Sequence, residues 1–217
     1  LVMNSCASSN TKNKTMYDKK QAVTDDKELK PVSAASGFDI TGDMKTGWNL
    51  GNTLDANSSR RNSETSWNQP LTTKAMIDGL AASGIKTIRI PTTWTNHIID
   101  DYYTIDPKWM TRVKEIVDWA IENDMYVILN CHHDNWERNA PMPPLRGYYP
   151  TSDNYEESCL FLENLWAQIA EAFNNGYDDH LIFESLNEPR LRGTNFEWTY
   201  NKNDSLNQDA INCLNGF

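Results

Sequence analysis

Residues 106–134 have the sequence DPKWMTRVKEIVDWAIENDMYVILNCHHD, in which a helix signal is followed directly by a strand signal. Asp106 is a good N-cap, Pro107 suits the first helical position, and apolar residues then recur at helical spacing as far as Ile121. After a short polar turn, the nearly continuous apolar run Met125–Asn130 is typical of a strand that is buried on both faces of a parallel sheet. This order predicts an α/β fold.

The same unit recurs on both sides of this stretch. Further strand-like runs are Gly47–Gly51, Ile85–Pro91 and Leu181–Leu186. Further helical patterns follow a cap at Thr72 or Thr73, cover Leu162–Phe173 and begin at Asp204. Four strand–helix repeats predict a parallel sheet with right-handed crossovers. Because a complete (β/α)8 TIM barrel typically takes about 250 residues or more, we expect this chain to supply about the first four βα units, with its first and fourth strands as edges.

The N-terminal segment differs in composition from the rest of the chain. Residues 1–36 are rich in polar residues and have no hydrophobic period, which predicts a flexible leader before a half-barrel at residues 37–217. The stretch from Leu1 to Cys6 resembles the end of a bacterial lipoprotein signal. We therefore expect a secreted or cell-surface protein, with Cys6 either a lipid anchor or an ordinary cysteine in a tail.

The charge balance and the aromatic content narrow the class of partner. The 217 residues include 20 Lys+Arg and 30 Asp+Glu, a formal net charge of −10. This acidity argues against nucleic acid and anionic membrane surfaces as partners, because both attract basic patches. The chain also holds 8 Trp residues, whose flat faces are suited to sugar rings.

Polar residues follow the predicted strands, at the end of a parallel sheet where ligands bind. Arg89 lies between two isoleucines in a buried strand, so it needs a partner there. That partner is either a structural ion pair or a carboxylate that Arg89 orients. Glu184 lies four residues before Glu188, and alternation along a strand predicts that both face the barrel interior.

His132 and His133 follow the third strand directly. Adjacent strand residues point to opposite faces, which argues against both binding one ion, and no further ligands appear at metal spacing. The sequence therefore predicts no metal and no cofactor, with one buried histidine and one histidine in the site.

Four motifs at these strand ends together resemble glycoside hydrolase family 5, over about residues 38–198. They are Gly47–Asp55, Ile88–Trp94, Val127–Asp134 and Leu181–Pro189. The first motif and the segment Glu64–Trp67 are similar to its subfamily of endo-β-1,4-glucanases and xyloglucanases.

The resemblance implies a (β/α)8 barrel and a retaining endo-β-1,4-glucanase acting on cellulose or a related β-glucan, such as xyloglucan or mixed-linkage glucan. It implies that Glu188 is the acid/base, that Asn187 binds the sugar 2-hydroxyl, and that Arg89 holds the nucleophile carboxylate. His132 would be the active-site histidine and His133 a sugar ligand. The family's nucleophile is a Glu on the seventh strand, so we expect the C-terminal half of the barrel, from the same protein or a second chain, as a partner.

The remaining candidates are residues that contact the polysaccharide or oligosaccharide substrate. Asn52 follows the first strand, and a sugar platform is expected from some of Trp48, Trp67, Trp94 and Trp136, with Trp136 ranked first. Two alternatives stay open: a non-catalytic glucan-binding fragment that lacks the nucleophile, and a β-mannanase or xylanase of the same family.

Overall fold

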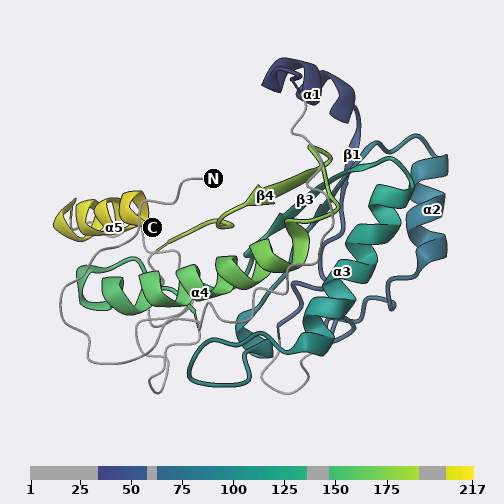
Figure 1. Cartoon of the computed structure of the whole chain (residues 1–217). Helices are drawn as coiled ribbons and strands as arrows, with labels where there is room; N and C mark the ends of the chain where they lie inside the picture. Colours follow the sequence, from purple (N-terminus) through teal and green to yellow (C-terminus); the bar gives the residue numbers. More distant parts are fainter. Residues whose placement is uncertain (1–33, 58–62, 136–146, 191–203) are drawn as a thin grey trace.

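The computed structural model describes residues 34–57, 63–135, 147–190 and 204–217 (Figure 1). The leader up to residue 33, with Cys6, lies outside the described residues, as does Trp136. None of the helices in the described ranges is long and apolar enough to cross a membrane.

Within these described ranges, four strands form a central parallel sheet in the order β1-β2-β3-β4. The strands are β1 (Gly47–Asn49), β2 (Thr87–Ile90), β3 (Tyr126–Asn130) and β4 (Leu181–Glu184). Each strand pairs with the next one along the chain, whereas a doubly wound sheet reverses its order at a switch point. The predicted α/β fold with consecutive parallel strands is confirmed.

Five α-helices in the described part of the chain accompany the sheet. They are α1 (Gly37–Met44), α2 (Lys74–Ala82), α3 (Pro107–Glu122), α4 (Tyr155–Phe173) and α5 (Asp204–Gly216). Figure 1 shows α2, α3 and α4 side by side along one face of the sheet, with α1 beyond one end of it. The consecutive strand order and this single helical layer are what the first half of a (β/α)8 barrel requires.

Alternation along the strands divides the core from the site. Ile88, Ile90, Val127 and Leu129 are fully buried and belong to the same core cluster as residues of α2, α3 and α4. The residues between them face the other side of the sheet, and Arg89 is one of these. Helix packing therefore fixes the strand that presents Arg89.

The local signals behind the predicted helices are visible in the structure. The Asp106 carboxyl accepts from the Lys108 backbone N–H at 2.9 Å, and Pro107 is the first residue of α3. Gly84, with φ +93°, follows the last turn of α2. Helix α1 was not predicted, although Ser36 and Asp39 form a reciprocal capping box at its start.

The two edge strands differ from the two central ones. The prediction of buried strands is confirmed for β2 and β3 but is wrong for β1, whose residues are all exposed, and for β4, which is partly exposed. Within the described part of the chain each edge strand has one neighbour, so Trp48 keeps 51% and Phe183 37% of its surface in solvent.

Candidate functional site

Arg89 lies at the centre of a polar network that reaches from β1 to the residues after β4. Its Nε donates to Glu184 Oε2 at 2.7 Å, and its Nη2 donates to Glu184 Oε1 at 2.6 Å. Nη2 also donates to Asn187 Oδ1 at 2.8 Å, and Nη1 donates to Asn49 Oδ1 at 3.0 Å. The predicted need for a partner is confirmed, and the partner in this chain is Glu184.

The network keeps Glu184 ionised. Burial raises the pKa of Glu184, but the hydrogen bonds from Arg89 and from Asn130 Nδ2, at 3.1 Å, outweigh burial and bring the pKa below its ordinary value. The same contact with Glu184 raises the pKa of Arg89. A fixed pair of opposite charges therefore lies where β2 and β4 end.

Asn187 and Glu188 come from the turn that follows β4. The Asn187 backbone N–H donates to the Cys131 carbonyl at 2.9 Å, which ties this turn to the end of β3. Glu188 has a φ of +42°, a left-handed conformation that is uncommon for a residue with a side chain. Its carboxyl is exposed and accepts from Arg190 Nη1 at 2.7 Å.

The predicted reason for the placement of Glu188 is wrong. Strand β4 ends at Glu184, so alternation along a strand does not extend four residues further. The turn and the left-handed backbone at Glu188 present its carboxyl instead.

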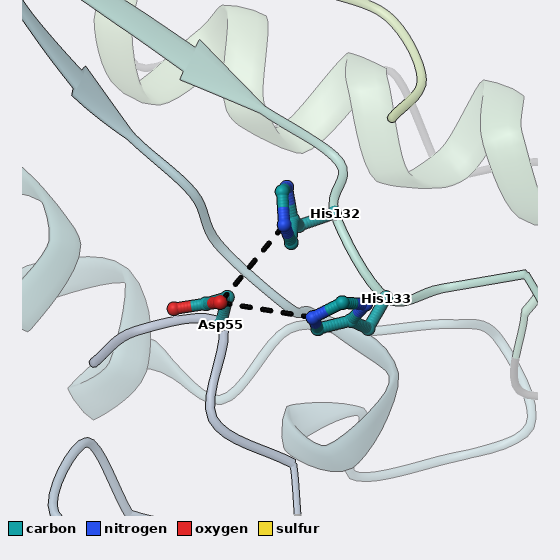
Figure 2. Close-up of side chains that lie close together, drawn as sticks. All are labelled: Asp55, His132 and His133. Carbon is teal, nitrogen blue, oxygen red and sulfur yellow. Dashed lines mark ion pairs between the residues drawn. The ribbon is translucent and has the colours of Figure 1, made fainter. Parts of the chain in front are cut away.

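Both histidines of the predicted pair lie beyond β3, which ends at Asn130, and their rings turn toward Asp55 (Figure 2). The Asp55 Oδ2 atom is 3.9 Å from His132 Nε2 and 3.6 Å from His133 Nε2. The two imidazole rings make an edge contact, with 4.4 Å between their centroids.

The argument that the two histidines face opposite sides is therefore wrong, because it holds only within a strand. Asp55, His132 and His133 each offer one atom of a kind that ligates metals, and these atoms lie within 4.8 Å of one another. No local signal assigns a role to Asp55, because His132, its neighbour in space, lies 77 residues further along the sequence.

Asn130 is a second site residue that the sequence analysis did not single out. It is fully buried as the last residue of β3, and its side chain contacts the Thr92 backbone, Glu184 and His132. Burial, followed by the nearby charges of His133 and Arg89, lowers the pKa of His132 to about 4. His132 is therefore neutral at pH 7.

Trp94, one of the predicted platform residues, has a different place. Its side chain has no exposed surface, and its indole Nε1 donates to the Asn130 carbonyl at 2.9 Å. The Asp134 carboxyl accepts from the backbone N–H groups of Trp94 and Thr95 at 2.9 and 2.7 Å, which folds this segment inward. The platform prediction is wrong for Trp94 because the short 3-10 turn Thr95–His97 carries it into the core.

The other predicted substrate contacts differ in position. Trp67 is half-buried, with its ring centroid 5.6 Å from that of His133, and its Nε1 donates to the Asn57 carbonyl at 2.9 Å. Asn52 is exposed in the turn after β1 with a φ of +63°. Trp48 is exposed on β1, the edge strand.

Comparison with known proteins gives a consistent result. Residues 51–216 match the family model described as Cellulase (glycosyl hydrolase family 5). The chain is 47% identical over 171 residues to Endoglucanase B of Ruminococcus albus, and this match covers 78% of this chain and 39% of that protein. It is 46% identical over 196 residues to Endoglucanase A of Clostridium longisporum, and this match covers 87% of this chain and 35% of that protein.

Solved structures give the same result for the fold. The chain is similar to a mutant of the glycoside hydrolase 5 lichenase from Caldicellulosiruptor sp. F32 in complex with cellotetraose, with a TM-score of 0.73 and 40% identity. That match covers 86% of this chain and 49% of the other, and it confirms the predicted (β/α)8 barrel class. The chain thus spans about two fifths of the length of the two curated relatives and about half of the solved structure.

Proposed function

Because the chain belongs to glycosyl hydrolase family 5, the cellulase family, we propose that it is part of a retaining endo-β-1,4-glucanase that hydrolyses cellulose or a related β-glucan. The observation that carries the proposal is the Arg89 network with Glu184 and Asn187, directly beside Glu188 and at the strand ends. Relatives with endoglucanase names and a relative bound to cellotetraose support this class of substrate.

Glu188 is the proposed acid/base. A retaining glycosidase needs one carboxyl group that protonates the leaving oxygen and later activates water. Glu188 suits this role because its carboxyl is exposed beyond the end of β4, whereas the carboxyl of Glu184 is held on both oxygens by Arg89.

Asn187 is proposed to bind the sugar 2-hydroxyl. Its Oδ1 accepts from Arg89 at 2.8 Å, so its orientation is fixed and its amide N–H groups are the ones available to a ligand. A donor at this position can strengthen its hydrogen bond to the 2-hydroxyl as the transition state forms.

The nucleophile is proposed to come from outside residues 1–217, in the C-terminal half of the barrel. A guanidinium has five N–H donors, and the described residues accept four of those of Arg89. The fifth, on Nη1, is proposed to hold the nucleophile carboxylate in its ionised form. The separation of that carboxyl from Glu188 should be about 5–5.5 Å.

His132, His133 and Trp67 are proposed to line one side of the sugar site. Their support is the ring contact between Trp67 and His133 and the convergence of both imidazoles on Asp55. Asn52 and Trp136 remain proposed substrate contacts from the sequence.

The central test is Glu188→Gln in the complete protein, assayed on carboxymethylcellulose, xyloglucan, mannan and xylan. Loss of general acid catalysis should lower kcat by about 10²–10⁴-fold on the preferred polysaccharide. Glu122→Gln on α3 is the matched control, because that carboxyl is exposed and pairs only loosely with Lys74 at 3.4 Å. Activity of Glu188→Gln within threefold of the parent would reject the assignment.

The same assays separate the alternatives. Highest activity on mannan or xylan would favour the hypothesis of a β-mannanase or xylanase. Binding of glucan without any hydrolysis would favour the hypothesis of a non-catalytic glucan-binding fragment. NMR of the first product formed tests the mechanism, because retention gives the β-anomer before mutarotation.

The protein is proposed to act outside the cell, either secreted or held at the cell surface by a lipid on Cys6, and the sequence around Cys6 supports this. Labelling with a radioactive fatty acid in the native host should mark the parent but not Cys6→Ser. Parent protein that is found in the medium without label would show that the protein is secreted and that Cys6 carries no lipid.

A further inference from the structure

The side chain of Asn130 has one orientation that satisfies all its contacts. The Thr92 backbone N–H points at one end of the amide, at 3.1 Å, and a backbone N–H is a donor only. That end must therefore be Oδ1, and the other end is Nδ2 with its two hydrogens. The backbone donor therefore decides the orientation of the amide.

The two hydrogens of Asn130 Nδ2 have two neighbours. One is Glu184 Oε1 at 3.1 Å, a carboxylate oxygen that accepts only. The other is His132 Nδ1 at 3.0 Å. Since Nδ2 donates to it, His132 Nδ1 must offer a lone pair and cannot carry a proton.

We infer that Asn130 is a positioning residue that fixes His132 as the neutral tautomer with its proton on Nε2. The low pKa of His132, about 4, agrees with this geometry, because an imidazolium would place an N–H opposite the Asn130 amide. His132 then presents a fixed donor on the side where Asp55 and His133 lie.

This tautomer has a consequence for the cluster of Asp55, His132 and His133. A metal bound at His132 Nε2 needs the lone pair of that nitrogen, which moves the proton to Nδ1. Metal-ligating histidines donate that second N–H to an acceptor, but here Nδ1 faces the Asn130 donor. We therefore infer that Asn130 keeps the cluster as a hydrogen-bonding site and disfavours divalent cations such as Zn²⁺.

The first test is the nitrogen NMR spectrum of His132 in the complete protein labelled with ¹⁵N-histidine at pH 7.5. His132→Gln identifies the signals. The expected pattern is an unprotonated Nδ1 and a protonated Nε2. A protonated Nδ1, or an even mixture of tautomers, would overturn the inference. The tautomer itself is measured on the parent protein, and the variant serves only to assign the signals.

The second test uses Asn130→Asp. The new carboxyl group still accepts from the Thr92 N–H. The oxygen that replaces Nδ2 can share one proton with Glu184 Oε1, which lies 3.1 Å from Nδ2, and it then offers only a lone pair to His132. The proton of His132 should therefore move to Nδ1. Zn²⁺ should then bind at least about tenfold more tightly than in the parent, in line with the effect of partners behind metal ligands. Adding Asp55→Asn to this variant should remove the gain.

Asn135→Asp is the matched control. Asn135 is also buried at this end of the sheet, and its side chain contacts Tyr148 and Arg190 instead of His132. It should leave both the His132 spectrum and Zn²⁺ affinity as in the parent. Equal Zn²⁺ affinity in Asn130→Asp and the parent would contradict the inference. Neither readout involves hydrolysis, so the inference can fail or hold independently of the proposed function.

Discussion

Arg89 on β2 and Glu184 on β4 form a two-point ion pair across the intervening strand β3, with N–O distances of 2.7 and 2.6 Å. Two parallel hydrogen bonds fix both distance and orientation. Because the pair links strands that are not neighbours, it holds the ends of β2 and β4 in register around Asn130 and Asn187. The site is thus built across three strands by one guanidinium.

Arg89→Lys should damage turnover more than binding. A lysine keeps the charge but loses the planar fork, so the groups around Glu188 shift, and a displacement of about 1 Å can cost about 100-fold in rate. Steady-state kinetics of the complete protein should show this loss in kcat with little change in KM. A raised KM with normal kcat would instead make Arg89 a substrate-binding residue.

Arg112→Lys is the control for that prediction. Arg112 on α3 forms a second two-point pair with Glu64, at 2.9 and 2.8 Å, and its other hydrogen bonds go to Glu115 and the Thr72 carbonyl. Its loss should lower thermal stability without the 100-fold loss of turnover.

Trp94→Ala should make the protein less stable to unfolding. Trp94 is fully buried and its indole is hydrogen-bonded, so truncation removes a large apolar volume and leaves the Asn130 carbonyl without this donor. The free energy of unfolding should fall by about 3–5 kcal/mol, measured by urea unfolding of the complete protein. Trp94→Phe with normal stability but no binding of cello-oligosaccharides would return Trp94 to the platform.

Trp67→Ala should have the reverse effects. The ring is half-buried next to His133, so its loss should weaken binding of cellotetraose, by calorimetry, more than it lowers stability. Trp67→Phe keeps an aromatic face and should restore most of the affinity. Unchanged affinity in the alanine variant would mean that Trp67 only packs its loop.

Stability should fall between about pH 6.5 and 4 because of His97. Burial lowers the pKa of His97 to about 4, and its ring stacks on Trp109 at 3.6 Å. In this window the unfolded chain binds a proton that the folded chain does not, so stability decreases as the pH falls and is fully present above about pH 6.5.

The check on this prediction is His97→Phe. The variant should reduce the slope of unfolding free energy against pH by up to about 1.4 kcal/mol per pH unit, measured by urea unfolding from pH 4.5 to 7. His132 has a lowered pKa too and should retain its own share of the slope. An unchanged slope in His97→Phe would show that His97 does not titrate with folding.

A polypeptide of these 217 residues alone should self-associate or aggregate. Edge strands β1 and β4 are exposed, with Trp48 and Phe183 partly in solvent, and such edges pair with other chains. A few hundred Å² of unburied apolar surface costs several kcal/mol at about 25 cal/mol per Å². Light scattering and calorimetry would contradict this if they found a monomer with one cooperative melt.

The four strands and the starts of α2, α3 and α5 were predictable because their signals are local. Asp106 and Pro107 mark the start of α3, and Asp204 marks that of α5, where the helices begin in the structure. The need of Arg89 for a partner also followed from its apolar neighbours. These predictions required only the sequence within a few residues of each position.

The site predictions that failed depended on where strands end. Alternation was extended past Asn130 to the histidines and past Glu184 to Glu188, although both strands stop at those residues. The roles of Asp55 and Asn130 depend on contacts between β1, β2, β3 and β4 that no local pattern encodes. The prediction that Trp94 belongs to a sugar platform failed because a surface loop and a turn that packs into the core have similar amino-acid composition.

The left-handed backbone at Glu188 sets stability against activity when this protein is engineered. Glycine adopts such a conformation without steric cost and asparagine with little, so either residue would relieve strain there while deleting the carboxyl of the proposed acid/base. Libraries selected for heat resistance alone should therefore accumulate inactive clones at this codon. Any directed-evolution campaign on this scaffold should hold codon 188 fixed or screen for turnover in every round.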